Sequence, residues 1–496
     1  MTETLFAFQN SYANLPDRFF AKLAPTPVRE PQLIHLNDGL AEVLGLKLED
    51  LRAPGGVAVL TGNQIADGSD PLAMAYAGHQ FGSWNPQLGD GRALLLGEVI
   101  GQDGLRYDVQ LKGSGPTPYS RMGDGRAGLG PVLREYIVSE AMAALGVPTT
   151  RALAATLTGE PVYREDGPLP GAVLTRISRA HIRVGTFQFF AARGDTDAVR
   201  HLADYVIDRL YPEAREATNP YVALLESVIA AQASVVAQWM HLGFIHGVMN
   251  TDNMSIAGET IDYGPCAFMD VFHPDKVFSF IDQMGRYRYR NQPGIAQWNL
   301  ANFAQSLLPL FDAEETKAVE TAQTAVDAFT AAFEQHHMAG FARKIGLCEA
   351  TEADAELVGN LLKAMAQGEA DFTLTFRSLS EVADPILGPD HDESMRSRFS
   401  DGSAFDTWAK DWRARLRDDP RSLEDRKSDM DAVNPAIIPR NHLVEAAIQA
   451  AYQDRDFTPF HDLTVALETP FAEPSDRTLA QPPTLQEEVR QTFCGT

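Results

Sequence analysis

A polar segment that follows a long apolar stretch carries side chains able to hold a divalent cation. Residues 246–253 end in Asp252 and Asn253, and Asp262 follows as the first residue of an Asp-Tyr-Gly sequence. Carboxylate and amide oxygens are the ligands that Mg²⁺ and Mn²⁺ prefer in proteins, so Asn253 and Asp262 are the candidate metal ligands. Asp252 adds a carboxylate that could accept a proton, although it could equally support the metal site or cap the loop.

The order of these residues matches the catalytic signature of protein kinases, in which a His-Asp-Asn loop precedes an Asp-Phe-Gly motif. His246 and Asn253 keep the spacing of the two ends of that loop, and Asp262 begins the second motif. The catalytic aspartate of kinases is replaced by Val248, which can neither accept a proton nor orient a hydroxyl group. The signature therefore predicts metal-dependent nucleotide binding and argues against ordinary phosphoryl transfer, with Asp252 as the nearest replacement carboxylate.

A lysine at the end of a predicted strand is a further point of similarity to protein kinases. Lys112 closes the predicted strand over residues 105–112, and a helix is predicted over 131–145. In kinases such a lysine contacts phosphates and pairs with a glutamate on the next helix. Glu135 and Glu140 point to different faces of the predicted helix, and we favour Glu135 as the partner. The alternative for Glu135 is a solvated charge in the first helical turn.

Two glycine-rich segments, residues 87–92 and 122–130, could bring backbone N–H groups close to phosphate oxygens. Each segment could also be an ordinary surface turn or connector. The candidate nucleotide contacts within them are Gly89, Gly91, Arg92, Asp124 and Gly125.

Arginines are concentrated in residues 176–183, within a chain that has 42 basic and 67 acidic side chains and a net charge of -25. Arginine recognises phosphate through paired hydrogen bonds, so Arg176 and Arg183 are candidate phosphate ligands, the alternative being a basic face paired with acids. The overall negative charge repels nucleic acid and anionic membranes, so neither is expected as a partner.

The composition predicts a folded chain of more than one lobe, since 44% of its 496 residues are hydrophobic and 22% are charged. Three cysteines without a paired spacing predict a reducing compartment, and the first ten residues lack a secretory pattern, so we expect a cytoplasmic protein. An uninterrupted apolar run of membrane-spanning length is missing, so a transmembrane helix is not expected. A monomer is favoured.

The predicted elements give an α+β fold of the protein-kinase-like two-lobe type, with a β-rich N-lobe containing one key helix and a mostly helical C-lobe. The expected parts are an N-terminal extension over 1–75, the N-lobe over 76–185, the C-lobe over 186–375, and a C-terminal extension over 376–496. Strands are predicted over 93–100, 105–112 and within 150–176, and helices over 131–145, 221–242, 298–311, 317–333, 355–365 and 443–452. We also expect a small hairpin around Gly258 and an irregular segment over 378–436.

Several of these motifs together resemble the selenoprotein O family over most of the chain. The similar segments are Ala-Tyr-Ala-Gly-His-Gln-Phe-Gly at 75–82, Gly-Asp-Gly-Arg at 89–92, residues 110–121, 123–130, 246–253 and 262–270, and the C-terminal residues 434–442 and 456–457. The resemblance implies a pseudokinase fold that binds ATP in a flipped orientation and transfers AMP to Ser, Thr or Tyr hydroxyls of proteins, itself included.

The resemblance also implies roles for the candidate residues. Lys112, Arg176 and Arg183 would hold the β- and γ-phosphates, and Asp252 would be the proton acceptor. Mg²⁺ or Mn²⁺ would be bound by Asn253 and Asp262. The nucleotide contacts would be Gly89, Gly91, Arg92, Asp124 and Gly125, together with Asp262.

Other functions remain open at this stage. The chain could be a kinase-like phosphotransferase in which Asp252 replaces the missing base, a transferase of UMP, or an inactive ATP-binding scaffold. Some family members carry selenocysteine near the C-terminus, where this chain has Cys494. An oxidised link between Cys266 and Cys494 is a hypothesis, and two separate thiols are the alternative.

Overall fold

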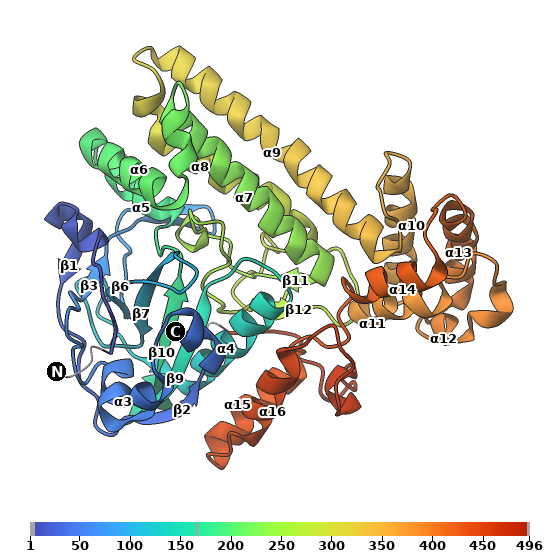
Figure 1. The fold of residues 1–496 in the computed structure, drawn as a ribbon, viewed down its shortest axis with the longest axis horizontal. Coiled ribbons are helices and arrows are strands. Elements are labelled where there is room, and N and C mark those ends of the chain that lie inside the picture. Colours follow the sequence, from blue (N-terminus) through green and yellow to red (C-terminus); the bar gives the residue numbers. More distant parts are fainter. Residues whose placement is uncertain (1–4, 165–166, 494–496) are drawn as a thin grey trace.

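The computed structural model describes residues 5–164 and 167–493 and shows an antiparallel sheet beside a larger group of helices (Figure 1). In the described residues the main sheet has eight strands in the order β1-β3-β6-β7-β10-β9-β2, with β8 paired to β10. The strands are β1 (Phe20–Lys22), β2 (Gln32–Leu36), β3 (Leu72–Met74), β6 (Ala93–Ile100), β7 (Arg106–Lys112), β8 (Ala127–Gly128), β9 (Arg151–Arg164) and β10 (Gly167–Ser178). Residues 1–75 therefore supply three strands to the same sheet as the candidate site.

The hairpin of β6 and β7 forms where the sequence predicted it, and it places Lys112 at the end of a central strand. Gly104 in its turn has a φ of 77°, a conformation that glycine adopts without strain. Lys112 lies opposite Ala93 on β6 and Leu174 on β10. Because strands flank β7 on both sides, the position of Lys112 is fixed by two ladders of backbone hydrogen bonds.

Helix α4 (Leu129–Ala144) covers one face of the sheet and carries Glu135. Its apolar side chains pack against β9 and β10 on one side and against α15 (Asn441–Gln453) and α16 (Thr458–Leu467) on the other. Tyr452 fixes this contact, since its hydroxyl accepts a hydrogen bond from Gly130 N–H at 2.9 Å. The C-terminal residues thus support the helix that carries Glu135.

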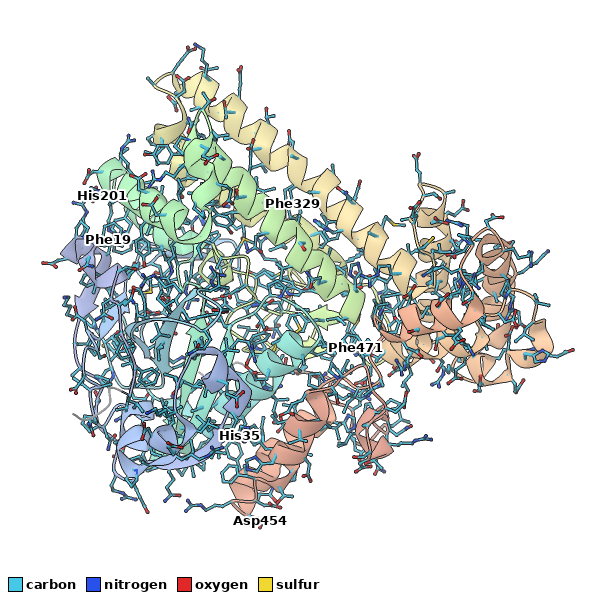
Figure 2. All side chains as sticks on the ribbon, in the orientation of Figure 1. Phe19, His35, His201, Phe329, Asp454 and Phe471 are labelled. Carbon is cyan, nitrogen blue, oxygen red and sulfur yellow. The ribbon has the colours of Figure 1, made fainter. Side chains whose placement is uncertain are left out.

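The helical part is built on α7 (Pro220–Leu242), which packs beside α8 (Gln292–Phe311) and α9 (Glu315–Lys344) (Figure 1). Asn219 caps the start of α7, and Gly243, with a φ of 68°, ends it. Two shorter helices, α5 (Val184–Ala191) and α6 (Thr196–Leu210), contact each other and pack against α8. Side chains fill the spaces between the ribbons, and the labelled Phe329 of α9 is 2% exposed within the largest core (Figure 2).

Among the described residues, α7 is long and apolar enough to cross a membrane by length and composition. Half of its most apolar window is buried inside the fold, and core helices of folded proteins meet the same criterion.

Two expectations about local structure are wrong. The small hairpin around Gly258 does not form, because Ser255 and Thr260 form isolated bridges with Arg183 and Thr149 instead of with each other. The segment 378–436 is not irregular. Its helices are α12 (Glu393–Arg396), α13 (Gly402–Leu416) and α14 (Leu423–Asp431), and it packs with α10 (Asp354–Gln367) and α11 (Phe372–Leu379).

The helices of this segment form because its few large apolar residues recur at helical spacing. Phe405, Trp408 and Trp412 of α13 are 0%, 4% and 0% exposed and belong to one core cluster. The buried ion pair of Arg413 with Asp392, which includes a 2.8 Å hydrogen bond, adds a tie between α13 and the residue before α12. The charged residues that suggested an irregular segment lie mostly on the outer faces of these helices.

The remaining elements are short. They include α1 (Asp38–Val43), α2 (Leu48–Arg52), α3 (Pro54–Leu60), β4 (Gly78–Gln80), β5 (Ser83–Asn85), β11 (Phe244–Ile245), β12 (Ala267–Phe268) and the single helical turn η4 (Thr251–Asn253). β11 pairs with β12 and so brackets the polar segment that contains η4.

Candidate active site

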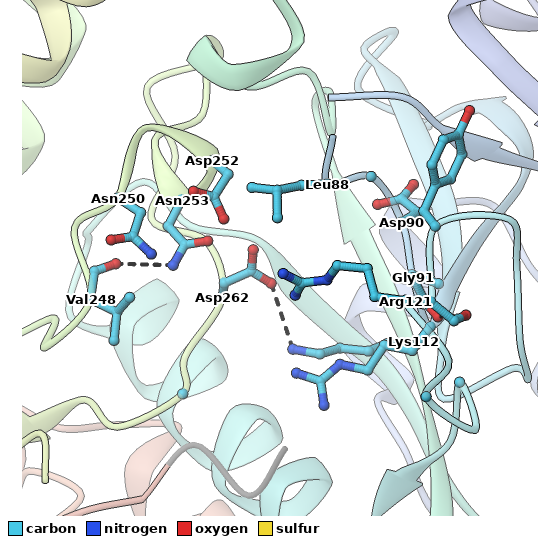
Figure 3. Close-up of a pocket in the computed structure, with 18 of the residues that line it drawn as sticks. Leu88, Asp90, Gly91, Lys112, Arg121, Val248, Asn250, Asp252, Asn253 and Asp262 are labelled. Carbon is cyan, nitrogen blue, oxygen red and sulfur yellow. Dashed lines mark hydrogen bonds and ion pairs between the residues drawn. The ribbon is translucent and has the colours of Figure 1, made fainter. Parts of the chain in front are cut away.

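A cavity of about 680 Å³ lies between the sheet and the helical part, and it collects the residues that the sequence singled out (Figure 3). All of the candidate nucleotide and metal residues line it, together with Asp252. Glu135 does not line the cavity and lies behind Lys112. Residues from distant parts of the sequence therefore meet in one place.

A network of opposite charges occupies one wall of the cavity. Glu135, which is 2% exposed, accepts hydrogen bonds from Lys112 Nζ and, at 2.5 Å, from Arg176. Burial alone would raise the pKa of Glu135, but the charges of Arg176 and Lys112 outweigh burial and hold the pKa below its ordinary value. The pairing of Lys112 with Glu135 rather than Glu140 is as expected, and Glu140 instead binds Arg151 at 2.6 Å.

Asp262 is the point at which three cationic side chains meet. Its carboxylate accepts a hydrogen bond from Arg183. It also lies 2.8 Å from the guanidinium of Arg176 and 3.6 Å from Lys112 Nζ. Burial would raise the pKa of Asp262, but Arg183, Arg176 and Lys112 together hold it well below the ordinary value. The backbone of Asp262 has a φ of 62°, which is strained for a residue with a side chain and is typical of functional sites.

The candidate catalytic loop, residues 246–253, is held in place by His246, whose side chain is fully buried. His246 Nε2 lies 2.9 Å from the carbonyl oxygen of Ile261, so the loop is tied directly to the residue before Asp262. Val248, which the motif spacing sets in place of the kinase catalytic aspartate, lines the cavity.

Asn253 and Asp262 lie together on the wall of the cavity beside Asp252, and Lys112 reaches toward Asp262 from the other side (Figure 3). Asn253 Nδ2 donates to the carbonyl oxygen of Val248 at 3.0 Å, which leaves its Oδ1 for a cation. Within residues 5–164 and 167–493 there is no group of three or more His, Cys, Asp or Glu side chains arranged as a metal site. Two protein oxygens fit Mg²⁺ or Mn²⁺ that takes its other ligands from phosphates and water.

Asp252 has one engaged and one unengaged carboxylate oxygen. Its Oδ2 accepts a hydrogen bond from Gln80 Nε2 at 3.2 Å, whereas Oδ1 is buried and has no partner in the described part of the chain. Burial raises the pKa of Asp252 to about 6, although the charge of Arg183 opposes the shift. A carboxyl group with a raised pKa on a residue that lines a cavity is typical of a group that accepts a proton.

Residues of both glycine-rich segments line the opposite wall, where residues 87–92 pack against Tyr119. Gly89 has a φ of 111°, and a side chain there would overlap the ring of Tyr119. A side chain at Gly91 would come within 2.9 Å of the Tyr119 carbonyl oxygen, so glycine is needed for this close approach. Asp124, beside Gly125, is held by Arg164 at 2.8 Å.

Sequence reasoning missed several residues of this cavity. Tyr76 lies under the guanidinium of Arg183 at 4.9 Å, and Asp90 is a buried carboxyl whose pKa burial raises to about 6. Arg121 lines the cavity with a φ of 50°, and neither it nor Arg92 forms an ion pair with a described carboxylate. The sequence signal for Tyr76, Asp90 and Arg121 was only their place inside motifs in which other residues were singled out; Arg92 had been predicted as a nucleotide contact.

Comparison with known proteins adds independent information. Residues 3–468 match the family model described as "Protein adenylyltransferase SelO". The chain is 61% identical over 492 residues to "Protein nucleotidyltransferase YdiU" of Rhodopseudomonas palustris (strain BisB5), with 99% of both chains covered. It is 59% identical over 493 residues to the protein of that name from Bradyrhizobium diazoefficiens, again with 99% of both chains covered.

Proposed function

The chain is a nucleotidyltransferase of the SelO family, and we propose that it transfers AMP from ATP to Ser, Thr or Tyr hydroxyls of proteins, including its own. The observation that carries this proposal is the convergence of Lys112, Arg176 and Arg183 on Asp262, in a cavity where Val248 replaces the kinase base. Such a cluster of cations suits the two terminal phosphates of ATP, which leave together as pyrophosphate.

We further propose that the fold is of the protein-kinase-like two-lobe type and that ATP is bound in the flipped orientation. The Lys112–Glu135 pair and the order of the Asn253 and Asp262 motifs support the first point. For the second, Arg176 is 2% and Arg183 3% exposed, so their charges are fixed in the wall of the cavity. Phosphates held there would leave the α-phosphorus as the one available to an acceptor, since the atom attacked is the one in line with it.

In the proposed reaction the acceptor hydroxyl gives its proton to the Asp252 carboxylate, and its oxygen forms a bond to the α-phosphorus. The bond from the α-phosphorus to the bridging oxygen breaks, and the electron pair leaves with pyrophosphate. Lys112, Arg176 and Arg183 stabilise the negative charge that develops on the leaving group. A bound Mg²⁺ or Mn²⁺, held by Asn253 and Asp262, would add Lewis-acid stabilisation of the phosphate oxygens.

A kinase-like phosphotransferase is the second candidate, because the Lys112–Glu135 pair is the arrangement that kinases use to hold ATP. UMP transfer would use the same residues with UTP. The mass of the protein after incubation with each nucleotide and metal separates these functions, since AMP, UMP and phosphate differ in mass. The proposal predicts addition of AMP, and addition of phosphate alone would contradict it.

We also propose that the protein acts in a reducing, cytoplasmic setting without nucleic acid as a partner, in keeping with its net charge of -25. The hypothesis of a Cys266–Cys494 link stays a proposal. Cys266 is 1% exposed beside the Asp262 motif, and Cys494 lies outside the described residues.

A further inference from the structure

The motif at residues 75–82 has no place in the chemistry described so far, although it forms part of the cavity. Its residues 78–80 form β4, the first strand of a small hairpin with β5, in which Gln80 lies opposite Ser83. This hairpin lies outside the main sheet and packs against η4, the turn that contains Asp252 and Asn253. Gln80 and Phe81 also line the cavity.

Three consecutive residues of the hairpin donate hydrogen bonds to three consecutive side chains of the catalytic loop. The bonds are His79 N–H to Thr251 Oγ1 at 2.7 Å, Gln80 Nε2 to Asp252 Oδ2 at 3.2 Å, and Phe81 N–H to Asn250 Oδ1 at 3.0 Å. Two of these donors are backbone groups, and only the bond to Asp252 depends on a side chain. A substitution at residue 80 can therefore remove the hydrogen bond to Asp252. Substitutions at residues 79 and 81 leave their backbone donors in place.

The hairpin also approaches Asp252 more closely than a side chain would allow. A Cβ atom at Gly78 would lie 2.6 Å from Asp252 Oδ1 and 3.0 Å from its Cβ. A Cβ at Gly185, on the first turn of α5, would lie 3.3 Å from Asp252 Cα and overlap the carbonyl oxygen of Ala77. Backbone on two sides thus restricts where the Asp252 carboxylate can go, and Gln80 holds one of its two oxygens.

We propose that Gln80 is a positioning residue that holds the Asp252 carboxylate through Oδ2, while Oδ1 packs against the backbone at Gly78, so that the carboxylate keeps the orientation in which it meets the acceptor hydroxyl. This inference rests on the proposed function, in which Asp252 accepts the proton. An amide side chain neither gains nor loses a proton in this role, so Gln80 acts through Asp252. A carboxylate with one oxygen fixed by a neutral donor is oriented without losing its negative charge. Correct orientation of a reacting group contributes to the rate and not to nucleotide affinity.

The test compares Gln80→Leu, which removes the donor, with Ser83→Ala, an exposed change on the facing strand of the same hairpin. Gln80→Leu is expected to lower kcat for transfer about 10-fold or more, with KM for ATP, affinity for a non-hydrolysable ATP analogue and thermal unfolding unchanged. Gln80→Glu, which keeps the shape and lacks the donor, is expected to act in the same direction. Ser83→Ala should match the wild type.

A double-mutant cycle with Asp252→Asn separates positioning from a general effect on the fold. If Gln80 acts through Asp252, Gln80→Leu costs nothing further when Asp252 has already been replaced. Equal losses in both backgrounds, or a normal rate for Gln80→Leu beside an inactive Asp252→Asn, would overturn the positioning role alone. A normal rate for Asp252→Asn would overturn the assignment of the proton acceptor and the positioning role with it.

Discussion

The carboxylate of Asp262 lies 2.8 Å from the guanidinium of Arg176 on strand β10. This ion pair joins the segment that follows residues 246–253 to the sheet. The same guanidinium contacts Glu135 on α4 at 2.5 Å. One buried arginine therefore sets the relative positions of the sheet, the helix that supports Lys112 and the candidate metal ligand. Changes at this junction test the site assignment directly.

Replacement of Asp262 by Ala or Asn is expected to abolish transfer, since either change removes a candidate metal ligand and the anion that orders three cations. Label transfer to protein measures the effect, and thermal unfolding shows whether each variant folds. Asp262→Asn is the more informative change because it keeps the side-chain shape. Full activity in the folded Asn variant would refute the assignment of the site.

Lys112→Ala is expected to lower the transfer rate by about 10²-fold or more, the usual loss when a charge-stabilising group is removed. Glu135 keeps Arg176 as a partner, so the variant should still fold. Lys363→Ala, on the exposed side of α10, is the matched control and should behave as the wild type. A loss of less than about twofold for Lys112→Ala would be inconsistent with phosphate binding by this residue.

Glu259, whose side chain is partly buried, is expected to make stability depend on pH. Burial raises the pKa of Glu259 to about 7, although hydrogen bonds from Ser178 and Arg179 N–H oppose the shift. In the unfolded chain the group ionises at an ordinary pKa near 4.5, so stability falls as pH rises from about 4.5 to about 7. Glu259→Gln removes this dependence.

The difference in free energy of unfolding between Glu259→Gln and the wild type should therefore shift in favour of the variant by roughly 2–3 kcal/mol as the pH rises from about 5 to about 8. Denaturant titrations at several pH values measure the difference. Glu226→Gln, an exposed change on α7, serves as the control. A difference between Glu259→Gln and wild type that is the same at every pH would contradict the expected titration.

Trp412→Ala tests whether α13 is part of the folded core. Trp412 is fully buried, and its indole N–H donates to the carbonyl oxygen of Ile345 at 2.8 Å. The variant is expected to lose about 3–5 kcal/mol of unfolding free energy, as large-to-small core changes do. Lys410→Ala on the same helix is the exposed control, and a loss of less than about 1 kcal/mol for Trp412→Ala would show that the segment is not packed.

The order of elements around the site could be predicted from local patterns. The alternation before Lys112 and the helical spacing around Glu135 each describe one continuous element, and β7 and α4 lie where these patterns placed them. Periodicity indicated that Glu135 and Glu140 point to different helix faces, and the preference for Glu135 is confirmed by its hydrogen bond with Lys112.

Other features depend on contacts that no local pattern records. The role of Gln80 requires a hairpin from one part of the chain to meet a loop that lies far along the sequence. Ser255 and Thr260 pair with Arg183 and Thr149, so their expected hairpin with each other was replaced by tertiary contacts. In 378–436 the charged residues concealed the helical spacing of Phe405, Trp408 and Trp412, whose burial stabilises α13.

Transfer of label from ATP to protein tests the central claim most directly. The protein is incubated with Mg²⁺ or Mn²⁺ and with ATP labelled either at the α-phosphorus or at the γ-phosphorus, with Asp262→Asn as the inactive control. The account predicts incorporation from the α-label alone, because the cations around Asp262 hold the two terminal phosphates that leave as pyrophosphate. Incorporation from the γ-label alone would make the protein a kinase and contradict the account.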